Sequence, residues 1–395
     1  MDVERAKRDE TPQPGSRHRL TAFRLGRWRS LAQRPAAATG PRRIERVPQT
    51  ERIVWIDAAR GVCVLAVVLM HTTLSAYLGY LQPGTSTGFW SWFIDAMTPF
   101  RMPGLAMLSG LLLARRVRTG WSDRTVRVSV ASSSWLYAVW LLAFALFAGL
   151  IGSYVWTGPI GMGEGFRLDA YLDQLVLPRT ILWYVFALAV WSALLATLRR
   201  VDPALILVAL AILSICSHYV PVADNNDQYR NLMRYAVFFA IGVYGSSWLR
   251  ERVHARHAPF AVAALAVYLG AGGIIAQGNP HVYVVLSVPR DAAAAILLLL
   301  LMSVLCRVRA IGAVLGWVGR RTLPIYVLHG LLLETLAYVP HWGSVIDRAG
   351  VRSVAPLLVT AAIAFLSIGV FELVVRTPAR VVFELPGPVR RALLR

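Results

Sequence analysis

The sequence is poor in acidic residues and in cysteine, and it lacks the patterns of several protein classes. Asp and Glu number 21 against 41 Lys and Arg, a formal charge of +20 over 395 residues. No aromatic–basic repeat accompanies this charge, so nucleic acid is not an expected partner. The three cysteines have neither metal-site nor disulfide spacing, so we expect packing residues, no metal and no permanently bound cofactor; they are Cys63, Cys216 and Cys306.

Apolar residues dominate instead. They make up 56% of the chain, and the mean hydropathy is +0.54, which is typical of a polytopic membrane protein. We predict an all-α fold with about ten transmembrane helices. Their approximate ranges are 53–77, 90–113, 129–152, 181–198, 203–220, 232–249, 259–276, 290–306, 322–339 and 353–375.

The distribution of arginine predicts the orientation. Alternate connections carry most of the basic residues, with five in 115–128 and five from Arg376 onward. The positive-inside rule then makes both termini cytosolic and the chain a multi-pass protein of the plasma or inner membrane. Residues 1–51 have no apolar run and are expected to be a disordered basic tail rather than a signal peptide. A ten-helix domain over 52–378 and a short basic tail over 379–395 complete the predicted organisation.

The first apolar segment carries three ionisable residues. At 100° per residue, Arg60 and His71 share one face of a helix, with Asp57 nearby. Such residues in a membrane helix are costly and usually face a cavity or a partner. A structural alternative pairs Asp57 with Arg60 at the interface and lets His71 hydrogen-bond within the bundle.

Further candidates lie on later segments. Arg124 and Arg127 share a helical face at a predicted cytosolic helix end, where two guanidinium groups could grip a phosphate. Arg101 and Ser109 lie in the second segment, where Arg101 suits a water-lined wall and Ser109 suits close helix packing. Trp183 opens the fourth segment, a position that an interfacial aromatic belt also explains.

The ninth segment holds Tyr326 and His329 one helical turn apart. A hydrogen bond between the two side chains inside a bundle would explain the pair without catalysis. Glu334 and Glu372 are carboxylates in apolar segments, and each is a candidate counter-ion for an arginine.

Taken in chain order, these residues resemble the membrane-bound acyltransferase-3 family, integral membrane O-acyltransferases that modify sugars and lipids. The resemblance covers residues 52–378. Arg101 departs from it, because the family usually has a smaller polar residue or His there. The matching residues are Asp57, Arg60 and His71 of an Asp-x-x-Arg-Gly and Arg-x10-His pattern, Ser109-Gly110, Arg124 and Arg127 of Arg-x-x-Arg, Leu182-Trp183-Tyr184, and Tyr326 and His329 of Tyr-x-x-His.

The resemblance implies transfer of an acyl group from cytosolic acyl-CoA to a hydroxyl of a sugar, glycan or lipid-linked acceptor, as in polysaccharide modification at the cell envelope. The expected partners are therefore acyl-CoA, that acceptor and the lipid bilayer. His71 would be the general base or a transiently acylated relay, and Asp57 would orient Arg60. Arg60, Arg124 and Arg127 would hold the anionic part of acyl-CoA. Candidate oxyanion donors are Tyr326, His329 and Arg101.

Two other functions fit the composition. A transporter of a glycan or lipid-linked intermediate would also line a pathway with charges, although such folds often show internal repeats that are not evident here. A sensor or scaffold would leave the polar stripe of the first helix without a role.

Overall fold

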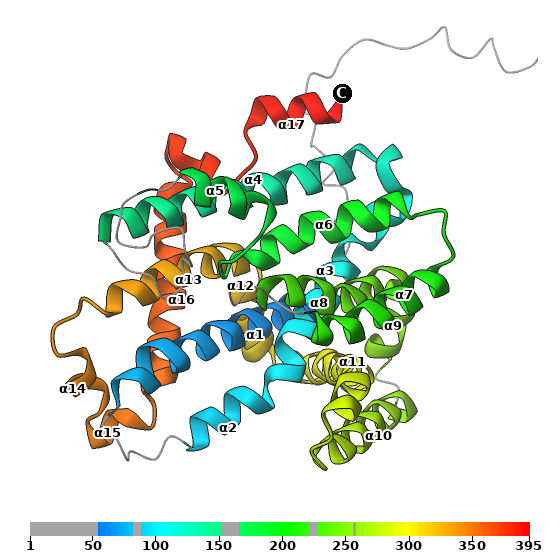
Figure 1. Cartoon of the computed structure of the whole chain (residues 1–395), viewed down its shortest axis with the longest axis horizontal. Helices are drawn as coiled ribbons and strands as arrows, with labels where there is room; N and C mark the ends of the chain where they lie inside the picture. The colour runs from blue at the N-terminus through cyan, green and yellow to red at the C-terminus, as the bar shows by residue number, and fades with distance from the viewer. Residues whose placement is uncertain (1–53, 82–87, 152–165, 167, 221–226, 256–257) are drawn as a thin grey trace, which may run out of the picture. The chain divides into compact units, whose positions relative to one another are not determined.

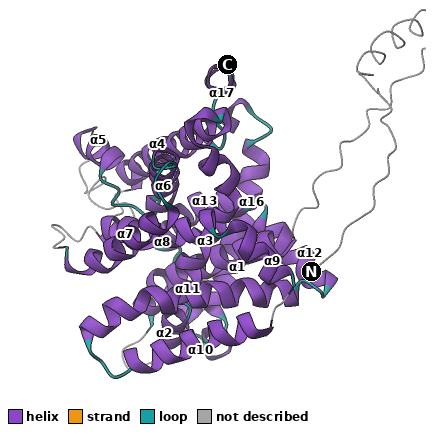
Figure 2. Ribbon diagram, turned by 90° about the vertical axis from the view of Figure 1, so that its right-hand side faces the viewer, coloured by secondary structure: helices purple, strands orange, loops and turns teal. Residues whose placement is uncertain are grey.

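The computed structural model describes residues 54–81, 88–151, 166, 168–220, 227–255 and 258–395. The chain divides into two units, Met1–Arg52 and Ile53–Arg395, and everything described lies in the second unit. The tail predicted over 1–51 therefore falls outside the described residues. Throughout the described ranges the secondary structure is helical, with no strand (Figure 2).

The described part of the chain contains seventeen α-helices (Figure 1). The first nine are α1 Val54–His71, α2 Gly88–Ala96, α3 Thr98–Thr119, α4 Arg124–Ile151, α5 Leu168–Val176, α6 Trp183–Thr197, α7 Pro203–Cys216, α8 Asp227–Tyr244 and α9 Ser246–His254. The remaining eight are α10 Ala258–Ile275, α11 Pro280–Leu305, α12 Arg309–Gly319, α13 Thr322–Leu336, α14 Trp342–Ile346, α15 Ala349–Arg352, α16 Ala355–Val374 and α17 Gly387–Leu394. A π-helical turn covers Thr72–Tyr77, and 3₁₀ turns cover Leu78–Tyr80, Gly120–Ser122, Ser217–Tyr219 and Pro378–Val382.

The helices are those of a polytopic membrane protein, as predicted. In the described part of the chain, five are long and apolar enough to cross a membrane: α1 with its extension, α4, α10, α11 and α16. Four shorter helices, α6, α7, α12 and α13, are also apolar. The number ten and the cytosolic termini stay predictions.

Local hydrogen bonds explain where several helices begin. Asp202 and Asn279 accept backbone N–H bonds at the starts of α7 and α11, and each is followed by a proline at the first helical position. Before α4, the Asp123 carboxylate accepts the Thr125 N–H at 2.8 Å. Hydrogen bonds from Thr125 hold the pKa of the Asp123 carboxyl below its usual value.

Three expectations need correction. The segment predicted over 90–113 is two helices, α2 and α3, separated at Met97, and the segment over 232–249 is divided at Gly245 into α8 and α9. The connection 307–321 contains the apolar helix α12. Within 379–395, predicted as a short basic tail, Phe383 is 3% exposed and contacts Trp140 of α4.

Helix α1 runs through the middle of the bundle and contacts α3, α11, α12, α13 and α16 (Figure 1). Glycines permit the closest approaches. Gly319 of α12 lies on the backbone of Asp57, and a Cβ at Gly61 would come within 2.8 Å of the Leu315 carbonyl oxygen. Gly110 of α3 lies against the Phe239 carbonyl of α8 in the same way, which is the close helix contact that a glycine permits.

We expect Gly110→Ala to destabilise the protein by about 1–3 kcal/mol, because a methyl group there overlaps the backbone of α8. Gly272→Ala on α10 is the matched control, since a Cβ added at Gly272 would meet no neighbouring atom within 4 Å. Thermal unfolding of the purified variants in detergent measures both. Equal melting temperatures would contradict the packing argument.

Candidate functional site

A cavity of about 500 Å³, here called the His71 cavity, opens between α1, α3, α6, α8 and α13. Its wall combines basic, amide and aromatic side chains with apolar ones. The lining residues are Val67, Met70, His71, Leu74, Arg101, Met102, Arg179, Ile181, Trp183, Gln228, Asn231, Tyr235 and Tyr326. Four of the residues singled out in the sequence, His71, Arg101, Trp183 and Tyr326, therefore share one cavity.

His71 is the last residue of α1, and the chain widens there into the π-helical turn Thr72–Tyr77. Such turns are rare and often occur at functional sites. The imidazole is half-buried, and its ring centroid lies 5.3 Å from that of His329 on α13. The sequence identifies both histidines as candidates, but it does not predict that they meet.

His329 is fully buried, and its backbone fixes its tautomer. Nδ1 lies 2.6 Å from the Tyr326 carbonyl oxygen, which can only accept, so Nδ1 carries a proton. In the neutral ring, Nε2 is then an acceptor, and among the described residues it has no hydrogen-bond partner. The pair at the cavity is therefore His71 with a second imidazole held in one orientation.

A smaller cavity of about 80 Å³, the Arg60 cavity, lies on the same side of α1 toward its N-terminus. Arg60 donates to the Thr322 hydroxyl at 2.9 Å. Asp57, one turn earlier, is 5% exposed. The lining residues are Arg60, Val64, Leu105, Ser109, Tyr184, Val185, Leu188, Thr322, Leu323 and Tyr326.

Tyr326 lines both cavities and forms the wall between them. Its hydroxyl donates to the Ile181 carbonyl, so the expected bond between the Tyr326 and His329 side chains is not formed. Tyr184 packs edge-on against Tyr326 and shares a 2.8 Å hydrogen bond with Ser109. Trp183 and Tyr184 are 7% and 4% exposed, so they lie inside the bundle rather than in a lipid-facing aromatic belt.

Arg124 and Arg127 are exposed at the start of α4 and line neither of these cavities. Arg124 donates to the Leu394 carbonyl of α17 at 2.8 Å. Beside this contact is a third cavity of about 380 Å³, the Arg390 cavity, between α3, α4 and the C-terminal segment. It is lined by Arg116, Thr125, Val128, Ser132, Leu136, Phe383, Glu384, Leu385, Arg390 and Leu394.

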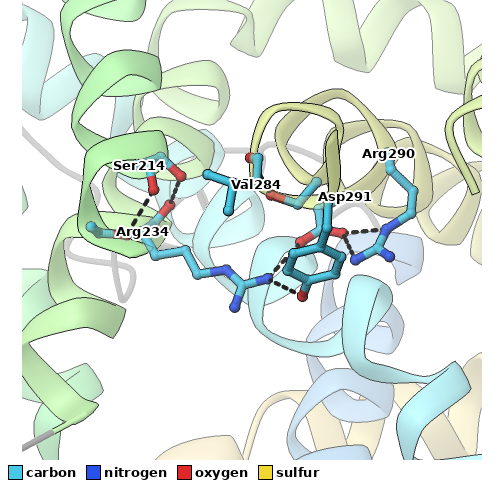
Figure 3. Close-up of polar contacts among 8 residues, drawn as sticks. Ser214, Arg234, Val284, Arg290 and Asp291 are labelled. Carbon is cyan, nitrogen blue, oxygen red and sulfur yellow. Dashed lines mark hydrogen bonds and ion pairs between the residues drawn. The ribbon is translucent and has the colours of Figure 1, made fainter. Parts of the chain in front are cut away.

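A buried ion cluster holds the α8 wall of the His71 cavity. Figure 3 shows Arg234 of α8 and Arg290 reaching Asp291 of α11 from opposite sides. Arg290 donates at 2.7 and 2.9 Å to one carboxylate oxygen, and Arg234 lies 3.6 Å from the other. Ser214 of α7 donates to the Arg234 carbonyl at 2.9 Å. Three helices are thus tied together next to Tyr235, which lines the cavity.

Several of these residues escape sequence reasoning. The sequence predicts a helix that starts at residue 290, which would leave Asp291 at its edge. In the structure α11 begins at Pro280, and Asp291 is buried at 1% exposure. The signal that could have revealed this start is the Asn279-Pro280 cap. Arg179 and Asn231 belong to connections that read as ordinary polar loops, and no local pattern marks them as cavity residues. Glu372 is paired as expected, 3.3 Å from Arg321.

The described residues contain no group of three or more His, Cys, Asp or Glu side chains placed to hold a metal ion. The side chains available for a ligand are instead cationic, amide and aromatic.

Comparison with known proteins identifies two similarities. Residues 53–374 match the model of the acyltransferase-3 family, described as an acyltransferase domain. The inner membrane protein YcfT of Escherichia coli (strain K12) is 25% identical over 237 residues, 56% of this chain and 65% of YcfT. The match therefore spans less than two thirds of that relative. No solved structure matches the chain.

We predict that the His71 and Arg390 cavities open on opposite sides of the membrane. In a variant without the native cysteines, a membrane-impermeant maleimide should label Asn231→Cys in spheroplasts of a bacterial expression host. Arg390→Cys should react only after permeabilisation, and Met107→Cys, which is fully buried, should react in neither case. Labelling of both cavities from one side would contradict the predicted topology.

Proposed function

Because the chain belongs to the acyltransferase-3 family, we propose that it is a membrane O-acyltransferase of the plasma or inner membrane, using acyl-CoA as donor and a hydroxyl of a sugar, glycan or lipid-linked molecule as acceptor. The observation that carries this proposal is the pair of imidazoles in the His71 cavity, 5.3 Å apart between ring centroids. A hydroxyl is a poor nucleophile until a base removes its proton, and imidazole suits this role near neutral pH.

The donor enters from the end of the bundle that carries Arg124 and Arg127. Guanidinium groups bind phosphate bidentately, and the neighbouring Arg390 cavity adds Arg116 and Arg390 to the basic surface. The acyl arm then extends past Arg60 toward Tyr326, the residue common to the Arg60 and His71 cavities. Ten residues lie between Arg60 and His71, so eleven helical steps separate the two by about 16 Å along α1.

The reaction breaks one C–S bond and forms one C–O bond. As His71 takes the hydroxyl proton, the acceptor oxygen attacks the thioester carbonyl carbon. The tetrahedral intermediate collapses with loss of the CoA sulfur, which leaves as a thiolate and receives the proton from the imidazolium. In the alternative relay, a His71 nitrogen attacks the thioester and CoA leaves as the thiolate, which takes the proton of the acylated ring. The acceptor hydroxyl then attacks the acyl carbon, the C–N bond breaks, and the hydroxyl proton returns to the imidazole.

His329 and Asp57 support the two halves of this path. His329, with its tautomer fixed by the Tyr326 carbonyl, packs beside the His71 ring at 5.3 Å between ring centroids and restricts the space in which that ring can turn. Asp57 lies one helical turn before Arg60. Its carboxylate stabilises the charge of the Arg60 guanidinium, at the end of α1 past which the acyl arm extends. The Tyr326 hydroxyl is already bonded to the Ile181 carbonyl, so Tyr326 acts as a wall and not as the oxyanion donor.

Removing the base should stop transfer without unfolding the protein. We expect His71→Ala to lower the release of CoA from acyl-CoA by at least about 100-fold. Binding of acyl-CoA and the melting temperature in detergent should remain close to wild type. A variant that retains turnover would rule out His71 as base and as relay. Absence of acyl-CoA consumption by the wild-type protein, over a panel of acyl lengths, would instead favour the transporter function.

Donor binding should depend on the arginines at the start of α4. The double variant Arg124→Ala/Arg127→Ala should bind acyl-CoA at least about ten-fold more weakly, because charge-assisted hydrogen bonds to phosphate are lost. Arg309→Ala removes an exposed arginine from another predicted cytosolic connection and is the control. Calorimetric titration of acyl-CoA measures both, and equal losses in the two would indicate only a long-range charge effect.

A further inference from the structure

The His71 cavity has a strong charge bias that the transfer chemistry does not require. Arg101 of α3 and Arg179, from the connection before α6, both line it, and none of its lining residues is Asp or Glu. A buried or half-buried cation usually has an anionic partner. Among the described residues that line the cavity, no side chain supplies that anion, so an anionic ligand would fill this role.

Both arginines have hydrogen-bond donors to offer. One terminal nitrogen of Arg101 donates to the Ile94 carbonyl at 2.8 Å, and a guanidinium carries five N–H groups. The Arg179 Nε is buried and has no hydrogen-bond partner among the described residues. An unsatisfied buried donor of this kind costs free energy unless a ligand pairs with it.

The rest of the wall suits a neutral ring with hydroxyl groups. Asn231 donates to the Gln228 side-chain oxygen at 3.3 Å, which orients both amides on the wall of the cavity. Trp183 and Tyr235 are stacked with ring centroids 5.9 Å apart and add flat apolar surface. Such a wall pairs amides with hydroxyl groups and aromatic faces with C–H groups.

The ion cluster behind the α8 wall of the His71 cavity is also positively charged. Arg234 and Arg290 share the single carboxylate of Asp291, so the cluster in Figure 3 keeps one positive charge. Arg234 also lies over the ring of Tyr235, 5.5 Å from its centroid. The field that this cluster adds at the cavity therefore reinforces that of Arg101 and Arg179.

We propose that the acceptor bound in the His71 cavity carries an anionic group, a carboxylate or a phosphate, held by Arg101 and Arg179 while its sugar ring lies against the amides and aromatic rings. This rests on the proposed acyltransferase function. It narrows the acceptor to acidic or phosphorylated sugars, and it makes the two arginines specificity determinants.

Matched ligands isolate the anionic group. Methyl glucoside and methyl glucuronide differ at C6 only, and glucose and glucose 6-phosphate provide the phosphate pair. We expect the full-length protein in detergent to bind at least one anionic sugar about ten-fold more tightly than its neutral counterpart by calorimetric titration. Which of the two anions binds distinguishes a carboxylate from a phosphate as the recognised group. The preference should shrink as salt is raised.

Variants then assign the preference to the cavity. Arg101→Gln and Arg179→Gln should each lose most of the preference, whereas Arg101→Lys should keep part of it because the charge remains. Arg348→Gln is the matched control, since it removes an exposed arginine from a connection on the same predicted side. Melting temperatures identify any variant that fails to fold. If Arg101→Gln does not fold, the binding preference of Arg101→Lys for the anionic sugar tests the proposal.

Equal binding of neutral and anionic sugars, or no binding of any at millimolar concentration, would overturn the proposal. So would a loss in Arg348→Gln equal to that in Arg101→Gln. The release of CoA from acyl-CoA by the same preparation, with water as acceptor, separates the two proposals. CoA release without an anionic preference defeats only the acceptor proposal, whereas an anionic preference without consumption of any acyl-CoA defeats only the acyltransferase function.

Discussion

The cost of burying charge beside lipid is the constraint on which the rest of this structure depends. Helix α1 carries charged and polar side chains through the middle of a hydrophobic bundle, and each has to meet a cavity or a partner. Arg60 meets the Thr322 hydroxyl, and His71 meets the ring of His329. Both contacts come from α13, so the helix that satisfies α1 also supplies the wall of both cavities. Arg60 and His71 are therefore both partnered by α13, one of the helices that contact α1.

This constraint explains why the sequence predicts so much of the site. Periodicity alone assigns Arg60 and His71 to one face of α1, because polar spacing at a helical period has few other physical causes. Sequence also identifies Tyr326 and His329 as a pair one turn apart. It does not predict their bonds, because the Tyr326 hydroxyl donates to a carbonyl on a different segment, that of Ile181. Such contacts depend on how helices far apart in sequence cross.

The errors have the same origin. Hydropathy detects apolar length, so it merges α2 with α3 and starts α11 ten residues too late. The charged residues Arg290 and Asp291 are typical of the boundary of a membrane-spanning segment, yet they form an ion pair inside α11. In the same way, Trp183 is typical of an interfacial belt by composition, but its ring stacks on Tyr235 within the bundle. A local sequence pattern indicates that burying a polar or charged side chain is unfavourable. It does not indicate which residue from a distant segment will pair with that side chain.

The separation of the basic groups also has a consequence for the proposed reaction. The proposed donor, acyl-CoA, carries phosphates, and the proposed acceptor carries an anion as well. If both entered one cavity, the two anions would repel each other over a few ångströms in a medium of low dielectric constant. Here Arg124 lies at the start of α4 and Arg101 lines the cavity at the far end of α1. Each anion then stays with its own arginines, and only the uncharged thioester and hydroxyl need to meet, at the wall formed by Tyr326.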